Sequence, residues 1–155
     1  MLRNPVDRAY SHYFQKFRKG KETRSLLEVV QGEDEFVKEE WVKAKSEPEY
    51  RSRKIQGRSL LSRGRYAEQL ENWFEHFPRD RFHILFSENL IQNGEKELLK
   101  IFNFLDLPSH KVDVSELKNK KDYAPMPEEA REWLVEYFRE PNRRLEKLLG
   151  LSLPW

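Results

Sequence analysis

Two side chains near the start of the chain, Arg3 and Ser11, combine residue types and a spacing that suit the binding of an anion. Asn4 can cap a helix and Pro5 suits a first helical position, so we expect a helix to begin directly after Arg3. A helix N-terminus presents unpaired N–H groups and partial positive charge, and a guanidinium can bind two phosphate oxygens at once. Ser11 adds a hydroxyl donor two turns along. The alternative is that Arg3 and Arg8 are solvated charges at a helix end.

The string RNPVDRAYSHY, residues 3–13, resembles the 3'-phosphate-binding signature of the sulfotransferase family, whose donor is 3'-phosphoadenosine 5'-phosphosulfate (PAPS). The resemblance implies that Arg3 and Ser11 hold the 3'-phosphate of this cofactor. The residues and spacing of this string resemble the carbohydrate-modifying members related to heparan sulfate sulfotransferases more than the cytosolic enzymes that act on phenols and steroids. The expected activity is therefore transfer of a sulfuryl group from PAPS to a carbohydrate hydroxyl or amine.

A second group of residues that suits a nucleotide is Lys118-Asn-Lys-Lys-Asp-Tyr123, placed before a helix that begins near Pro127. Several lysines followed by an aromatic ring can bind a phosphate and pack against a base, although lysine-rich turns are mostly solvated. In the sulfotransferase family a basic loop at this place closes over the 3'-phosphate and adenosine. The resemblance thus implies cofactor contacts from Lys118, Lys121 and Tyr123, with the register of the lysines open by one residue.

The transfer half of a sulfotransferase site is not recognisable in this sequence. The family holds the 5'-phosphosulfate in a glycine loop containing Lys and Thr, but the six glycines here form no such pattern. The nearest imitation, residues 19–23, follows a predicted helix instead of a strand. His12 is the one histidine near the predicted phosphate site, and a lone histidine is more often a packing or surface residue than a base. The catalytic residues therefore stay unknown, and no metal-ligand spacing is present.

The position of the first motif favours an incomplete domain. Met1 and Leu2 are interpreted as the end of a buried strand, and the sequence given does not include the residues expected to form the rest of it. We therefore expect residues 1–155 to be a single sulfotransferase domain that lacks its N-terminal part. The second hypothesis is a non-catalytic remnant or binding module for adenosine 3',5'-bisphosphate or an anionic glycan. An upstream phosphosulfate-binding loop would favour the enzyme, whereas a lack of stabilisation by adenosine 3',5'-bisphosphate would favour the remnant.

The elements that must position these residues follow α/β order. Apolar spacing predicts helices over 5–18, 25–31, 63–77 and 95–105, and the apolar run 82–86 predicts a buried parallel strand. Two more helices are expected from Pro127 and Pro141, the second ended by Gly150. Gly64, Tyr66 and Trp73 are interpreted as structural. The predicted fold is thus the helix-rich C-terminal part of a P-loop-type α/β sulfotransferase domain with a small parallel sheet remnant.

Two segments of opposite charge lie between these elements. Residues 33–49 carry seven acids and three lysines, which predicts a marginal surface helix or a mobile excursion. Residues 51–65 contain six basic residues and no acid. Such a run is either a solvated loop or a basic lip beside a cleft for an anionic acceptor.

Composition limits the partners. Lysine plus arginine exceed aspartate plus glutamate by only two, 29 against 27, so a general nucleic-acid coat is not expected. The chain has no cysteine, so a disulfide or a thiolate metal site is excluded. No apolar run approaches membrane-spanning length and no signal peptide is visible. The expected partners are a nucleotide donor and a carbohydrate acceptor, and the expected compartment is the cytoplasm.

Overall fold

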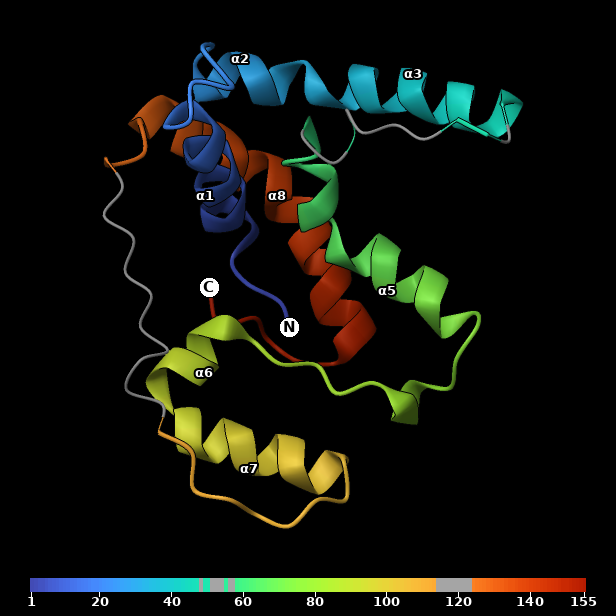
Figure 1. The fold of residues 1–155 in the computed structure, drawn as a ribbon, viewed down its shortest axis with the longest axis vertical. Helices are drawn as coiled ribbons and strands as arrows, with labels where there is room; N and C mark the ends of the chain where they lie inside the picture. Colours follow the sequence, from blue (N-terminus) through green and yellow to red (C-terminus); the bar gives the residue numbers. More distant parts are fainter. Residues whose placement is uncertain (48, 51–54, 56–57, 114–123) are drawn as a thin grey trace.

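The computed structural model describes residues 1–47, 49–50, 55, 58–113 and 124–155. Regular structure in this part of the chain is helical, and Figure 1 shows the arrangement of the helices. In chain order they are α1 (Pro5–Phe17), α2 (Leu26–Gln31), α3 (Glu33–Ser46), the 3-10 turn η1 (Ser62–Gly64), α5 (Tyr66–Phe74), the 3-10 turn η2 (Arg79–Arg81), α6 (Ser87–Gln92), α7 (Gly94–Phe104) and α8 (Glu128–Leu149).

Helix α8 links the two apolar clusters that form the core. Its N-terminal half packs against α1 and α2, where Leu134 and Phe138 are fully buried. Its C-terminal half packs against α5, and Leu145 joins a second cluster with Leu2 and Phe86. In Figure 1, α8 runs diagonally through the molecule between these partners. The C-terminal segment then returns so that both chain termini lie near each other. The ring centroids of Trp155 and Phe86 are 5.5 Å apart.

The prediction of two closing helices is wrong, because α8 continues through Pro141. Proline lacks an N–H donor and so removes one hydrogen bond of the helix, at a typical cost of about 3 kcal/mol. Phe138 on one side and Leu145 on the other are each buried in a different cluster. Burial of a large apolar side chain contributes about 1.5–3 kcal/mol, so packing on both sides holds the two halves in one helix. Gly150 ends the helix in the left-handed conformation, as predicted.

The predicted sheet remnant is not confirmed. The described residues contain no β-strand, and one isolated parallel bridge joins Leu2 to Phe86. The Leu2 N–H donates to the Leu85 carbonyl at 2.7 Å, and the Ser87 N–H donates to the Leu2 carbonyl at 2.8 Å. Helix α1 begins three residues after Leu2, and α6 begins one residue after Phe86. Parallel pairing therefore occurs where it was expected but is too short to make a strand.

Several other helices follow the sequence closely. Asn4 caps α1 by accepting from the Val6 N–H at 3.0 Å, and Ser25 opens α2 with a capping box to Glu28. The predicted helix 63–77 is instead η1 followed by α5, which ends at Phe74. Trp73, interpreted as structural, is 51% exposed and packs against Phe77.

Of the two alternatives for residues 33–49, a surface helix or a mobile excursion, the structure shows the helix, α3, over most of this length. Its first residue, Glu33, is only 2% exposed although the composition suggested a surface segment. Because its carboxylate binds backbone groups of residues 60–62, it ties the start of α3 to the rest of the molecule.

Candidate functional site

Arg3 is held in place by its neighbours on both sides and by its own backbone. The Leu2 bridge fixes the residue before it, and the Asn4 N–H donates to Glu88 Oε1 on α6 at 2.8 Å. The Tyr66 hydroxyl of α5 donates to the Arg3 carbonyl at 3.0 Å. The start of α6 and the start of α5 therefore position the Arg3 backbone before α1, which supports the structural role predicted for Tyr66.

The structure brings Arg3 and Ser11 to one cavity of about 280 Å³. The lining consists of Arg3, Arg8, Ser11, His12, Gln15 and Arg63. Within the described part of the chain, no carboxylate contributes to this lining. Three guanidinium groups, a hydroxyl, an amide and an imidazole can all donate hydrogen bonds, so the cavity suits a phosphate or another oxyanion.

The pKa shifts in the cavity come first from burial and then from its positive charge. The pKa of His12 falls from 6.5 to about 4, because the ring is partly buried and lies near Arg63, Arg8 and Lys16. Burial also lowers the pKa of Arg8, and the nearby charges of Arg63 and Arg3 act in the same direction. His12 is therefore neutral at pH 7, and a bound anion would relieve repulsion among the cations.

Arg63 enters the cavity from η1, which is held by a buried carboxylate. Glu33 accepts from the backbone N–H groups of Leu60, Leu61 and Ser62 at 2.6–2.9 Å. It also accepts from the Ser62 hydroxyl at 3.1 Å. Burial raises the pKa of Glu33 despite these hydrogen bonds, each of which favours the ionised form. The start of α3 thus fixes the turn that carries Arg63 toward α1.

Gly64 allows this turn to approach the core. A Cβ atom at this position would lie 2.6 Å from the Phe138 ring and 3.0 Å from the Cβ of Pro5. The first position of α1 and the centre of α8 therefore leave no room for a side chain. The structural role predicted for Gly64 follows from this close packing.

The second predicted group, Lys118, Lys121 and Tyr123, lies outside the described residues. The described chain resumes at Ala124, whose carbonyl accepts from the Tyr10 hydroxyl at 2.5 Å. Tyr10 lies on α1 one residue before Ser11. The segment that follows the predicted loop is therefore attached to the helix that carries the anion cavity.

The described arginines of the basic run 51–65 form neither a solvated loop nor a separate lip for an acceptor. Arg63 lines the anion cavity, whereas Arg65 pairs with Asp34 at 2.8 Å. The Arg58 guanidinium lies over the Phe36 ring of α3 at 4.7 Å. Arg51, Arg53 and Lys54 lie outside the described residues. Of the described members, one contributes to the site and two hold α3 to the segment that follows it.

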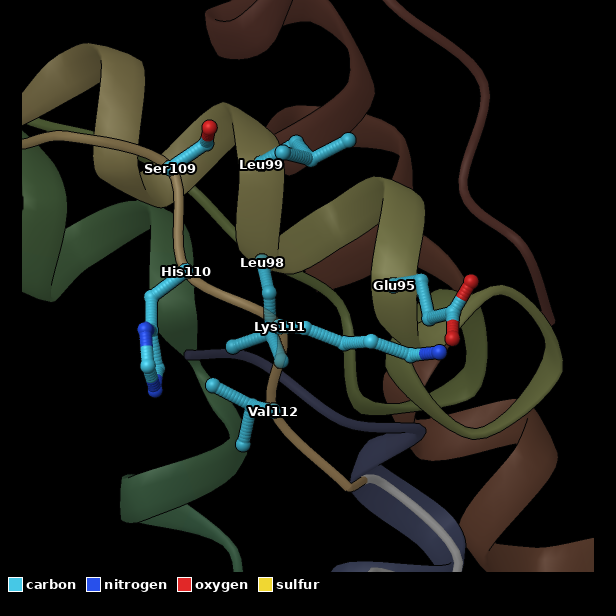
Figure 2. Close-up of a pocket in the computed structure, with 7 residues that line it drawn as sticks. All are labelled: Glu95, Leu98, Leu99, Ser109, His110, Lys111 and Val112. Carbon is cyan, nitrogen blue, oxygen red and sulfur yellow. The ribbon is translucent and has the colours of Figure 1, made fainter.

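A cavity of about 320 Å³ beside α7 has a different chemistry. Leu98, Leu99 and Val112 give it apolar walls, and Figure 2 shows the Lys111 side chain extending toward the Glu95 carboxylate. Because a carboxylate is among its polar groups, this cavity is less suited to a phosphate than the cavity on α1. Among the described residues that line it, none is a predicted site residue.

Sequence reasoning missed Gln15 and Arg63 as lining residues, and treated Arg8 and His12 only as weak candidates. A signal for three of these was present, because Arg8, Ser11, His12 and Gln15 have the i, i+3, i+4, i+7 spacing of one helix face. Arg63 had no comparable local signal. Its place depends on the contact between Glu33 and the turn, which joins residues nearly thirty positions apart.

No group of His, Cys, Asp and Glu side chains suited to a metal ion occurs among the described residues. The described helices also include none with the length and apolar character needed to cross a membrane.

Comparison with known proteins places this arrangement in a family. The model of the sulfotransferase domain matches residues 1–141. The chain belongs to the sulfotransferase domain family. This match spans both the α1 cavity and most of α8, so it covers all the elements that position the site. It agrees with the resemblance carried by residues 3–13.

Curated relatives and a solved structure show the same relationship. The chain is 32% identical over 98 residues to the membrane-associated sulfotransferase kil1 of Dictyostelium discoideum, covering 62% of this chain and 20% of that protein. It is 29% identical over 172 residues to the bifunctional heparan sulfate N-deacetylase/N-sulfotransferase of Drosophila melanogaster, covering 96% of this chain and 16% of that protein. A sulfotransferase structure from Alicyclobacillus acidocaldarius matches 99% of this chain and 54% of its own, with 27% identity and a TM-score of 0.76.

The chain therefore spans a fifth or less of these two curated relatives and about half of the solved sulfotransferase. Their activities belong to proteins that are much longer than the chain described here. What the likeness supports directly is a sulfotransferase domain with the corresponding fold.

Proposed function

We propose that this chain provides the 3'-phosphate-binding part of a sulfotransferase that uses PAPS. The observation that carries the proposal is the cavity shared by Arg3 and Ser11, which Arg8 and Arg63 make strongly positive. In this role the Arg3 guanidinium and the Ser11 hydroxyl contact the 3'-phosphate. Lys118, Lys121 and Tyr123 cover the phosphate and the adenosine in the same proposal.

The proposed acceptor is a carbohydrate hydroxyl or amine. Support comes from two relatives named as heparan sulfate N-deacetylase/N-sulfotransferases, from Drosophila melanogaster and Xenopus laevis. In the reaction, the bond from sulfur to the 5'-phosphate oxygen breaks and a bond from sulfur to the acceptor oxygen or nitrogen forms, while a base takes the acceptor proton. The alternative proposal is a binding module that holds adenosine 3',5'-bisphosphate or an anionic glycan without transfer.

The binding role is tested by calorimetric titration with adenosine 3',5'-bisphosphate. We expect Arg3→Ala to weaken binding at least a hundredfold and Ser11→Ala roughly tenfold, since a charged hydrogen bond contributes more than a neutral one. Adenosine 5'-phosphate, which lacks the 3'-phosphate, should bind weakly to the unaltered chain and to both variants. Arg18→Ala is the matched control, because Arg18 is an exposed arginine at the opposite end of α1. Unchanged affinity in Arg3→Ala would refute the phosphate assignment.

A further inference from the structure

A groove of about 560 Å³ lies along α3, outside the anion cavity. Its lining residues are Asp34, Val37, Lys38, Trp41, Val42, Lys45 and Arg65. The volume is within the range of about 300–1,000 Å³ that is typical of ligand pockets. Arg65 is two residues from Arg63, so the groove and the anion cavity adjoin the same short segment of chain.

Helix α3 uses one face for folding and leaves the neighbouring face open. The folding face carries Glu33, Phe36 and Glu40, which contact residues 60–62, the Arg58 guanidinium and the Tyr50 hydroxyl. Four of the groove residues follow a separate stripe with i, i+4, i+7, i+11 spacing: Asp34, Lys38, Trp41 and Lys45. On that side Trp41 is 56% exposed and Val42 is 67% exposed. Large apolar side chains gathered on an open face often mark a binding surface.

The polar groups of this groove favour an anionic ligand. Asp34 accepts from Arg65 at 2.8 Å and from the Tyr137 hydroxyl at 3.0 Å, which compensates its charge. Lys38 and Lys45 are exposed, and neither forms an ion pair with another described residue. They lie one turn before and one turn after Trp41 on the same helix. The groove thus presents a flat indole between two ammonium groups.

We propose that this groove binds a segment of an acidic oligosaccharide, with a sugar ring packed on the Trp41 indole and carboxylate or sulfate groups on Lys38 and Lys45. Lys38 and Lys45 lie seven positions apart, which is about 10 Å along the helix axis and comparable to two linked sugar rings. An acidic peptide would satisfy the lysines but offers no saturated ring for the indole. The inference rests on the proposed function in taking a carbohydrate as the acceptor, but it concerns a site separate from the nucleotide cavity.

The experiment titrates the chain with a heparin octasaccharide at about 0.15 M salt, where weak surface attractions are screened. We expect Trp41→Ala and the double variant Lys38→Ala/Lys45→Ala each to weaken binding roughly tenfold. Trp41→Phe should keep most of the affinity, because it preserves an aromatic face. The matched control is Lys43→Ala, which removes one charge from another face of α3, where Lys43 pairs with Glu40. The octasaccharide affinity of this control should stay within about twofold of that of the unaltered chain, since exposed charges at the edge of a site contribute little.

Two ligand controls separate the sources of binding. A neutral maltooctaose should bind weakly, and an octaglutamate peptide should bind without any dependence on Trp41. Octasaccharide affinity that stays at the level of the unaltered chain in Trp41→Ala and in the lysine variant would overturn the proposal, as would an octaglutamate affinity that matches the octasaccharide affinity. Circular dichroism of each variant should show an unchanged helical signal, because these side chains are exposed.

The readouts also keep this site distinct from the nucleotide site. Adenosine 3',5'-bisphosphate affinity should be unchanged in the groove variants, and octasaccharide affinity should be unchanged in Arg3→Ala. If the phosphate assignment is wrong, Arg3→Ala leaves nucleotide binding intact while the groove variants still lose octasaccharide binding. If the groove proposal is wrong, the groove variants keep their octasaccharide affinity while Arg3→Ala still loses nucleotide binding.

Discussion

His12 shows how burial and the nearby arginines of the cavity act together on one side chain. The ring lies beside Arg8 and Arg63, and its pKa of about 4 keeps it uncharged across the physiological range. A neutral imidazole can donate one hydrogen bond to an anion without adding to the repulsion among the guanidinium groups. Ser11 precedes it on α1, so a small set of consecutive and facing residues provides donors of three different kinds.

The His12 shift makes the stability of the chain depend on pH. Because the pKa is about 4 when folded and 6.5 when unfolded, the unfolded chain binds more protons between these values, and stability falls as the pH drops through this window. We expect His12→Gln to reduce that loss by about 1–2 kcal/mol, allowing for screening of a half-exposed ring. Urea unfolding at pH 7.5 and at pH 4.5 measures the difference. His76→Gln, at an exposed histidine, is the control, and an identical pH dependence in both variants would contradict the assignment.

At the scale of the elements, local signals predicted where helices begin and end, and long-range contacts decided the rest. Asn4, Ser25 and Gly150 mark helix ends through caps that depend on adjacent residues, so the sequence was sufficient there. The single helix α8 could not be predicted from Pro141, because burial of Phe138 and Leu145 in separate clusters outweighs the local preference. The buried state of Glu33 likewise depends on backbone groups that the sequence does not identify as its partners.

Glu33 is the residue through which α3 controls the anion cavity. We expect Glu33→Gln to lower the free energy of unfolding by about 2–3 kcal/mol, because an amide nitrogen would face backbone N–H donors that now have a carboxylate acceptor. The turn that carries Arg63 would loosen, so adenosine 3',5'-bisphosphate affinity should fall severalfold. Denaturant unfolding and calorimetric titration measure the two effects.

The control for this substitution is Glu35→Gln, an exposed position in the first turn of the same helix. It removes the same charge near the helix N-terminus, so it should cost no more than about 0.5 kcal/mol. Equal effects of the two substitutions would show that helix charge, and not the contact with residues 60–62, explains the role of Glu33.

At the scale of the whole molecule, the site depends on segments far apart in the chain. Leu2 meets residues 85–87, Tyr66 holds the Arg3 carbonyl, and Glu33 fixes the turn before Arg63. A sequence motif identified Arg3 and Ser11 because both lie within one short segment, residues 3–13, at the start of α1. The contribution of η1 could not be predicted in the same way, since it requires that α1, α3 and α8 first pack together.

Because α8 contributes to both apolar clusters, we expect the two clusters to unfold together. Leu134 is 0% exposed in the first cluster and Leu145 is 1% exposed in the second, so each substitution to alanine should cost about 2–5 kcal/mol. Either variant should shift a single unfolding transition. Far-UV circular dichroism monitors the helices and near-UV circular dichroism monitors packing of the aromatic rings, and the two signals should change together. Val135→Ala, at a half-exposed position on the same helix, should shift the transition little. Two separate unfolding transitions in either leucine variant would show that the clusters are independent. In that case α8 does not couple Leu2, the residue before Arg3, to the cluster formed with α1 and α2.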